Sequence, residues 1–152
     1  MRKIKKIGVL TSGGDCGGLN ASIRSIFLTA KKSYKLDVYG IRNGTLGLIK
    51  RPLDVQKLSY KNFEGFLIKQ GGTFLGTNSK GDPFKFFKNG KYVDVTKKII
   101  SAYKYLDLDG LIVIGGDGSM KILKKISDIG DLKIVGIPKT IDNDVGDRKS
   151  VV

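Results

Sequence analysis

Residues 111–119 read LIVIGGDGS, an unbroken apolar run that ends in a turn of glycines around one carboxylate. Four consecutive apolar residues followed by turn residues are typical of a strand buried on both faces, as in a parallel sheet. After the turn, Met120, Leu123 and Ile126 recur at helical spacing and predict a helix with one apolar side. The stretch therefore predicts a strand that passes directly into a helix, the basic unit of an α/β fold.

The same alternation extends along the chain in both directions. Strands are predicted at residues 6–10, 37–41 and 134–137, and a glycine-rich turn after the first strand leads into an amphipathic helix from residue 19. Asn89-Gly90 predicts a small hairpin. We therefore expect a three-layer, Rossmann-like α/β fold, with a mostly parallel, doubly wound sheet, helices on both faces and a β-hairpin excursion.

Capping residues predict two more helices. Ser59 is placed to cap a helix that buries Phe63, Phe66 and Leu67, and Asp94 or Thr96 is placed to cap another that follows the hairpin. Residues 71–82 between them are rich in glycine, threonine, asparagine and serine, so we expect a functional or mobile loop there.

Composition limits the class of protein. The 152 residues, 40% of them hydrophobic, suit one domain, and no apolar run is long enough to cross a membrane. The N-terminus has no secretory signal pattern, so we expect a cytoplasmic protein. Cys16 is the single cysteine and histidine is absent, which excludes an internal disulfide, catalytic triads and histidine-bound zinc.

The net charge of +14 predicts a partner that is anionic: nucleic acid, a membrane surface or a phosphorylated metabolite. The excess lies in lysines scattered along the chain, without an arginine-rich block or interleaved aromatic residues. This pattern favours a solvated, lysine-rich surface over nucleic-acid binding.

Three polar segments follow predicted strands, and the carboxyl ends of parallel strands are where such folds bind ligands. Residues 11–20 (TSGGDCGGLN) predict a phosphate cradle of backbone N–H groups at a helix N-terminus, although a turn that binds nothing fits this loop as well. Their spacing matches neither the dinucleotide fingerprint nor the P-loop. In the second segment, Asp117 lies among small residues and is a candidate ligand for Mg²⁺ on polyphosphate oxygens.

The third segment, TIDND at residues 140–144, has two carboxylates at alternate positions. In an extended chain Asp142 and Asp144 project to the same side, with Thr140 beside them. One is then a candidate general base and the other a support for metal or substrate, and the alternative is a surface acidic turn.

Four blocks of the sequence resemble the phosphofructokinase family, in the family's order and over nearly the whole chain. They are LTSGGD with GLNA in residues 10–21, GGTFLGT at 71–77, GGDGS at 115–119 and PKTIDND at 138–144. The resemblance implies transfer of the γ-phosphoryl group of ATP to the 1-hydroxyl of fructose 6-phosphate, a step of glycolysis. It also implies a set of ATP-binding residues: Gly13, Ser79, Lys80, Gly116, Asp117, Gly118 and Ser119.

The same resemblance assigns the metal and the acceptor site. Asp117 matches the Mg²⁺-binding aspartate and Asp142 the general base, while Thr140, Ile141 and Asp142 match the fructose 6-phosphate site. Lys139 and Asp144 are assigned supporting roles. Phosphoryl transfer depends on positioning and charge neutralisation, which these residue types supply without histidine.

The identity of the donor depends on two positions. By the resemblance, Gly118 matches the ATP-dependent members, because pyrophosphate users have an aspartate there. Lys139 matches the pyrophosphate-dependent and mixed group instead. We give Gly118 more weight, since a flexible lysine does not exclude ATP, and pyrophosphate remains the alternative donor.

The chain departs from the family pattern in three places. Gly17 replaces a usual proline, Ser79 stands where many members have a donor-binding arginine, and residues 145–152 do not continue the pattern. We therefore expect residues 1–144 to be the N-terminal nucleotide-binding domain of a truncated or frame-interrupted phosphofructokinase, with an atypical tail and no second domain. Full-length members are typically homotetramers with effector sites between subunits.

Two rival functions remain. NAD and lipid kinases share a Gly-Gly-Asp-Gly turn after a strand, but the blocks at residues 11–21 and 140–144 argue against them. A non-catalytic, basic nucleic-acid-binding module is the rival from another class. It predicts affinity that falls steeply with salt and is indifferent to Asp117→Ala.

Overall fold

The computed structural model describes residues 4–78 and 81–141, and these form an α/β fold around one five-stranded sheet. The strand order is β3-β2-β1-β6-β7, and β3 alone runs antiparallel to its neighbour. The strands are β1 (Lys6–Ser12), β2 (Asp37–Ile41), β3 (Val55–Lys57), β6 (Gly110–Gly115) and β7 (Ile134–Pro138). The predicted parallel α/β architecture is therefore confirmed.

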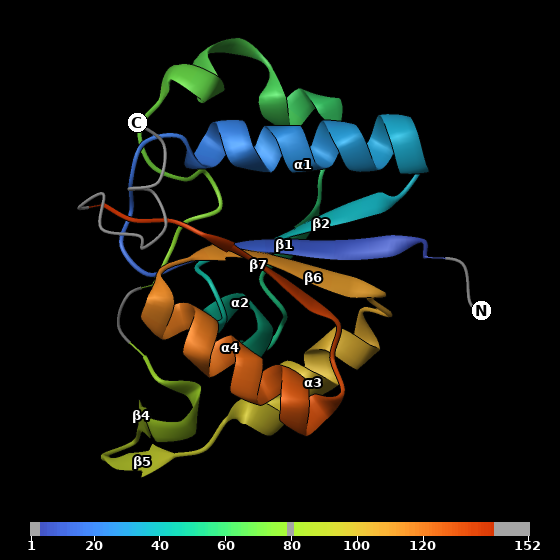
Figure 1. The fold of residues 1–152 in the computed structure, drawn as a ribbon. Helices are drawn as coiled ribbons and strands as arrows, with labels where there is room; N and C mark the ends of the chain where they lie inside the picture. The colour runs from blue at the N-terminus through green and yellow to red at the C-terminus, as the bar shows by residue number, and fades with distance from the viewer. Residues whose placement is uncertain (1–3, 79–80, 142–152) are drawn as a thin grey trace, which may run out of the picture.

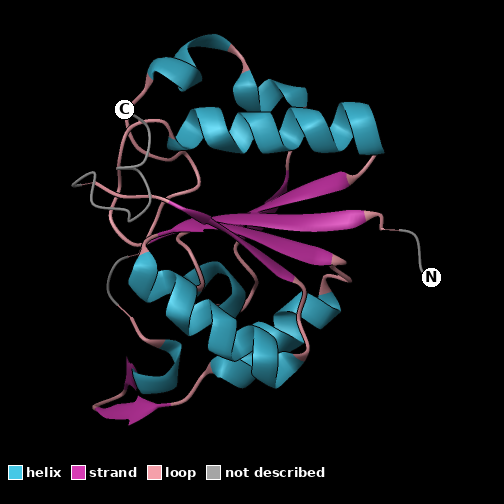
Figure 2. Ribbon diagram, viewed as in Figure 1, coloured by secondary structure: helices cyan, strands magenta, loops and turns pink. Residues whose placement is uncertain are grey.

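Helices cover both faces of the sheet. Figure 1 shows α1 on one face, with two short 3₁₀ helices, η1 and η2, beyond it, and α2, α3 and α4 on the other. Figure 2 shows the resulting three layers, with the strands in the middle. The bounds are α1 (Leu19–Tyr34), α2 (Leu46–Ile49), η1 (Tyr60–Phe63), η2 (Gly65–Lys69), α3 (Thr96–Tyr105) and α4 (Asp117–Gly130).

The core lies in two clusters, one on each side of the sheet. On β1, Val9 packs with Ile23 and Phe27 of α1, whereas the next residue, Leu10, packs with Leu123 of α4 on the opposite side. All five side chains are buried. Because successive strand residues face opposite layers, both must be apolar, which explains the unbroken apolar runs of β1 and β6.

The segment after Ser59 differs from the single helix predicted there. It forms η1 and η2, which are separated by the extended Glu64. Gly65, the first residue of η2, has a φ of +70°, in the left-handed region, so a right-handed helix cannot continue through this point. The predicted cap is present, since the Ser59 amide donates to Asn62 Oδ1 at 2.8 Å. Phe63 is buried and its ring stacks on Phe27 of α1 at 4.9 Å, which attaches η1 to the helix layer.

The predicted hairpin is confirmed and lies away from the main sheet (Figure 1). A short 3₁₀ helix, η3 (Pro83–Lys85), leads into its strands, β4 (Phe86–Lys88) and β5 (Lys91–Val93). Asn89 and Gly90 both have positive φ, as the tight turn requires. Within residues 4–78 and 81–141, no helix has the length and apolarity to span a bilayer.

Candidate nucleotide-binding site

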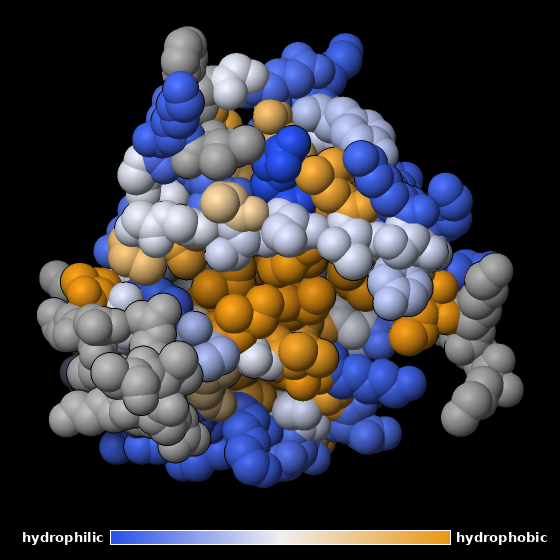
Figure 3. Space-filling view, turned by 45° about the horizontal axis from the view of Figure 1, so that its top comes forward, coloured by the Kyte–Doolittle hydropathy of each residue, from blue (hydrophilic) through white to orange (hydrophobic). Residues whose placement is uncertain are grey.

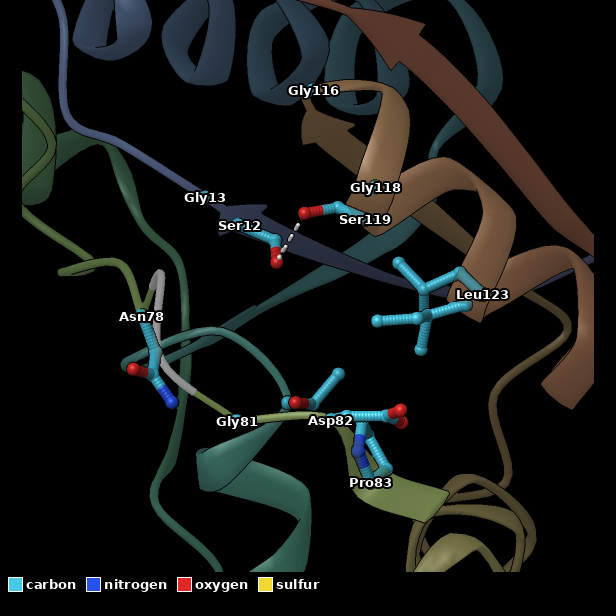
Figure 4. Close-up of a pocket in the computed structure, with 12 residues that line it drawn as sticks. Ser12, Gly13, Asn78, Gly81, Asp82, Pro83, Gly116, Gly118, Ser119 and Leu123 are labelled. Carbon is cyan, nitrogen blue, oxygen red and sulfur yellow. Dashed lines mark hydrogen bonds between the residues drawn. The ribbon is translucent and has the colours of Figure 1, made fainter. Parts of the chain in front are cut away.

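A pocket of about 400 Å³ opens at the carboxyl ends of β1 and β6. Four of the residues predicted to bind ATP line it: Gly13, Gly116, Gly118 and Ser119. Figure 4 shows them across the pocket from a second wall, which is made by Asn78, Gly81, Asp82 and Pro83. The structure therefore brings together two glycine-rich turns that are about 100 residues apart in the sequence.

The parallel register of β1 and β6 places these two turns side by side. Ser12, the last residue of β1, pairs with Gly115, the last residue of β6. Across the gap, Ser119 Oγ donates a hydrogen bond to Ser12 Oγ at 3.0 Å (Figure 4). Gly116 is extended and α4 begins at the next residue, so the N-terminus of α4 borders the pocket. The first amides of a helix have no intrahelical partner, and they attract anions such as phosphate.

The loop that faces Gly13 holds it in a left-handed backbone conformation that glycine adopts without strain. Its φ of +86° is one that side-chain-bearing residues rarely adopt. Its amide donates to the Asn78 carbonyl at 3.1 Å, and its carbonyl accepts from Thr77 Oγ1 at 2.6 Å. These two bonds fix the turn after β1 against residues 77–78, so they join Gly13 of one pocket wall to the loop that carries Asn78 of the other.

Two buried polar residues, Thr11 and Asn20, hold the 71–78 loop in place, whereas the sequence analysis assigned them only to the predicted phosphate cradle of residues 11–20. Thr11 Oγ1 donates to the Gly76 carbonyl at 2.9 Å, and Asn20 Oδ1 accepts from the Phe74 amide at 2.8 Å. Thr11 is fully buried and Asn20 nearly so. Both could have been found from the sequence, because the periodicity of the strand and of the helix places these two polar residues on the buried side. Asn78 of the pocket wall was also missed.

Asp117 is the first residue of α4, but its side chain is 78% exposed and does not line the pocket. Its carboxylate lies 2.7 Å from the Lys121 ammonium, one helical turn further along. The hydrogen bond to Asp117 raises the pKa of Lys121 above its usual range. The candidate metal ligand is therefore paired with a surface lysine at the rim of the pocket.

The residues present fit Mg²⁺ only in combination with a phosphate ligand. Among the described residues, no group of three or more acidic, cysteine or histidine side chains is arranged to hold a metal ion. Mg²⁺ is commonly held by one or two carboxylates together with substrate phosphates and water. An exposed Asp117 beside the N-terminus of α4 satisfies that requirement, because its partner Lys121 is also exposed and free to move aside.

Lys139 connects the end of β7 to the turn after β1. Its amide donates to the Gly115 carbonyl at 3.0 Å, and its ammonium donates to the Gly14 carbonyl. The ammonium also lies 3.8 Å from the point where a Cβ would stand on Gly13. This places a positive charge next to the turn predicted to receive phosphate.

Two residues of the predicted acceptor site follow Lys139. Thr140 is half-buried, and Ile141 is 60% exposed, with its side chain directly over Gly14. The other predicted site residues, Ser79, Lys80, Asp142 and Asp144, lie outside the described residues, as does the predicted tail at 145–152.

Comparison with known proteins identifies relatives along almost the whole chain. A family model described as phosphofructokinase matches residues 6–150. An ATP-dependent 6-phosphofructokinase 1 of Nostoc sp. is 51% identical over 148 residues, which cover 96% of this chain and 40% of the relative. The protein of the same name from Synechocystis sp. is 52% identical over 147 residues, with the same coverage.

Solved structures of the same kind share the fold. The chain superposes on phosphofructokinase from Pichia pastoris with a TM-score of 0.74 and 27% identity, over 94% of this chain and 16% of that one. A pyrophosphate-dependent phosphofructokinase from Marinobacter aquaeolei gives a TM-score of 0.71 at 24% identity, over 92% of this chain and 34% of that one. The chain spans about 40% of the length of the curated relatives that it matches.

Proposed function

Because the chain belongs to the phosphofructokinase family, we propose that it supplies the donor-binding part of an ATP-dependent 6-phosphofructokinase. In this proposal the γ-phosphoryl group of ATP is transferred to the 1-hydroxyl of fructose 6-phosphate, as a step of glycolysis. Residues 1–144 are the nucleotide-binding domain. The complete enzyme works in the cytoplasm as a homo-oligomer, a homotetramer as in full-length members.

One observation carries the proposal: Gly13 and the Gly116–Ser119 turn line a single pocket, at the carboxyl ends of neighbouring parallel strands. The pocket has room for a polyphosphate, and the α4 N-terminus favours negative charge there. The described side chains that line it include one charged group, Asp82, whose Oδ1 accepts from the Phe84 amide at 2.9 Å and caps η3. Anion binding here therefore depends on backbone amides, and on cations that reach in from the rim.

The open space around Gly118 supports ATP as the donor. A Cβ at this position would meet no atom within 4 Å, so the turn leaves room for the rest of a nucleotide beyond its terminal phosphates. The Nostoc and Synechocystis relatives are both named ATP-dependent. In this proposal Ser79 and Lys80 complete the ATP site, and the Lys139 ammonium supplements charge neutralisation at Gly13 and Gly14.

Asp117 holds Mg²⁺ together with phosphate oxygens in this proposal. The ion, when bound, supplies neutralisation of the charge that develops on the transferred group. Lys121 then releases Asp117 and stays in solvent, at little cost because both groups are exposed.

On the acceptor side, Thr140, Ile141 and Asp142 contact fructose 6-phosphate, and Asp142 accepts the proton of the attacking hydroxyl. Asp144 supports the geometry of this segment. The anchoring of Lys139 to Gly115 and Gly14 favours these roles, because it brings the start of the segment to the same end of the sheet as the pocket.

Calorimetric titration of the chain with Mg-ATP tests the donor site. Asp117→Ala is expected to weaken binding about tenfold, the loss of one charge-assisted contact. Asp128→Ala is the matched control, because Asp128 lies on the same helix, is exposed and pairs with Lys124 at 3.3 Å, but lies away from the pocket. The control is expected to bind Mg-ATP like the unaltered chain.

Three results contradict the proposal. The first is absence of Mg-ATP binding, and the second is an equal effect of the two substitutions. The third is nucleic-acid affinity that falls steeply with salt and does not respond to Asp117→Ala. Binding of Mg-pyrophosphate without binding of Mg-ATP would assign pyrophosphate as the donor instead.

A further inference from the structure

The β4–β5 hairpin carries two exposed aromatic side chains. Phe87 of β4 pairs with Tyr92 of β5, and their rings meet edge to face with centroids 5.3 Å apart. A cross-strand pair of this kind stabilises a hairpin. Even so, the two residues remain 62% and 74% exposed, whereas the preceding residue of β4, Phe86, packs against the main core. The aromatic pair therefore forms an apolar patch that faces solvent.

The hairpin projects from the body of the molecule on a fixed base (Figure 1). At the base, the Val95 amide donates to the Pro83 carbonyl at 2.8 Å, which joins η3 to the start of α3. At the tip, a Cβ on Gly90 would meet no atom within 4 Å, and the residues on either side of it are exposed. The tip is therefore held away from the rest of the described chain.

Three exposed lysines accompany the aromatic pair: Lys85, Lys88 and Lys91. Lys88 and Lys91 pair with each other across the strands, next to the aromatic pair and directly before the tip. Within residues 4–78 and 81–141, none of the three forms an ion pair. The acidic residues that flank the segment, Asp82 and Asp94, accept hydrogen bonds from backbone amides at the starts of η3 and α3. The hairpin thus presents positive charge that no neighbouring carboxylate neutralises.

We propose that the β4–β5 hairpin is a docking surface for an anionic lipid bilayer. In this arrangement Phe87 and Tyr92 insert among the headgroups, and Lys88 and Lys91 lie against lipid phosphates. Aromatic side chains favour the headgroup level of a bilayer, and the negative surface of the cytoplasmic leaflet attracts lysines. The proposal goes beyond the proposed function, since it requires neither nucleotide nor catalysis.

Two other occupants fit the hairpin less well. A second copy of the chain would bring its own lysines against these, and lysines on edge strands oppose strand pairing between copies. Successive bases of a single-stranded nucleic acid stack on open ring faces. Here the rings are packed at 61°, so the edge of one ring meets the face of the other. A compact apolar patch beside cations instead suits a lipid surface, which deforms around a projecting tip.

Co-sedimentation of the full chain with lipid vesicles tests this proposal. The chain is expected to sediment with vesicles made of equal parts of phosphatidylcholine and phosphatidylglycerol, and to stay in solution with vesicles of phosphatidylcholine alone. Added sodium chloride is expected to weaken the binding, because it screens the attraction of the lysines to the lipid phosphates. The measurement uses no ATP, so this proposal and the proposed donor site can fail independently.

Tyr92→Ser and Lys91→Gln test the two parts of the surface separately. Loss of one lysine is expected to lower the vesicle partition coefficient about fivefold, and loss of the ring is expected to lower it at least as much. Circular dichroism melts establish that each variant is folded. Because Lys91→Gln leaves the aromatic pair in place, it still tests the proposal if Tyr92→Ser disrupts the hairpin.

Tyr34→Ser and Lys32→Gln are the matched controls on α1, which packs on the opposite face of the sheet. Both residues are exposed, and Tyr34 borders a second apolar surface, which Figure 3 shows below α1. The controls therefore report binding through net charge or through that other surface. Both are expected to bind the anionic vesicles like the unaltered chain.

The proposal is overturned if the folded, unaltered chain does not bind the anionic vesicles, or if it binds the neutral vesicles equally well. It is also overturned if the controls weaken binding as much as the hairpin variants do. Two further results would name another occupant in the absence of vesicle binding. Dispersal of a homodimer by Tyr92→Ser would assign a second copy, and loss of binding to single-stranded oligothymidylate in that variant would assign a nucleic acid.

Discussion

Thr11 has no exposed surface, and its hydroxyl donates to the Gly76 carbonyl at 2.9 Å. Thr11→Val keeps the shape of the side chain but leaves the half-buried Gly76 carbonyl without this donor. We expect the free energy of unfolding to fall by about 1 kcal/mol, the usual net contribution of one intramolecular hydrogen bond. Urea denaturation measures the loss, and hydrogen exchange is expected to speed up at residues 73–76.

Thr29→Val is the control for this substitution. Thr29 lies on α1 and is exposed, so the same chemical change is expected to alter stability by less than about 0.5 kcal/mol. Equal destabilisation by the two substitutions would mean that the Thr11 hydroxyl does not hold the loop.

At the level of single residues, the sequence alone predicted part of the candidate site. Glycine-rich turns after apolar strands are local patterns, and they located Gly13 and the Gly116–Ser119 turn that share the pocket. The pairing of Thr11 with Gly76 connects positions 65 residues apart, and no local pattern encodes it. Asp117 is exposed and pairs with Lys121, and the spacing of residues alone does not determine whether such a surface ion pair forms.

At the scale of elements, Asp37 joins three of them. It is the first residue of β2, and its carboxylate accepts hydrogen bonds at 2.7 Å from Lys31 of α1 and Lys57 of β3. The bonds from these two lysines hold the pKa of Asp37 below its ordinary value. A carboxyl whose pKa is lower in the folded state adds stability above its unfolded pKa and loses it as the pH falls.

Asp37→Asn is therefore expected to lower stability at pH 7 by less than about 1 kcal/mol, because a third of the Asp37 side chain is exposed and solvent weakens the pair. The difference between variant and unaltered chain is expected to shrink as the pH falls below about 4, near the ordinary pKa of aspartate, and to disappear at lower pH. Urea midpoints measured across this pH range provide the comparison.

Asp128→Asn serves as the reference, because Asp128 is 65% exposed and pairs with a lysine of its own helix only. A stability difference for Asp37→Asn that stays constant down to pH 2 would contradict the assigned role of the two lysines.

The elements that the sequence predicted best are those with the strongest burial. The predicted strand at residues 37–41 coincides with β2, and those at 111–114 and 134–137 extend by one or two residues at their ends. Strand β3 was missed because its three residues, Val55 to Lys57, include two polar ones and pair at the sheet edge. The single helix predicted after Ser59 is not present, because Gly65 has a positive φ that a right-handed helix does not allow. The prediction was wrong because the apolar spacing of this segment gives no sign of that backbone conformation.

For the whole molecule, the net charge of +14 is the dominant electrostatic feature. Self-repulsion among so many lysines destabilises the compact state, and added salt screens it. We expect the midpoint of thermal unfolding to rise when sodium chloride increases from about 0.01 to 0.15 M, as the Debye length falls from about 30 to 8 Å. Potassium chloride is expected to act in the same way, and an unchanged or falling midpoint would mean that surface ion pairs outweigh the repulsion.

The alignment of Ser12 with Gly115 also limits how the gene can change over time. One codon gained or lost inside β6 would move the start of α4 by about 3.3 Å relative to β1 and reverse the side to which every later residue of the strand points. During evolution, this strand can therefore accept the replacement of one aliphatic residue by another, but its length must stay constant. Insertions and deletions belong instead to segments such as the β4–β5 hairpin, whose dimensions have no bearing on the distance between the two turns.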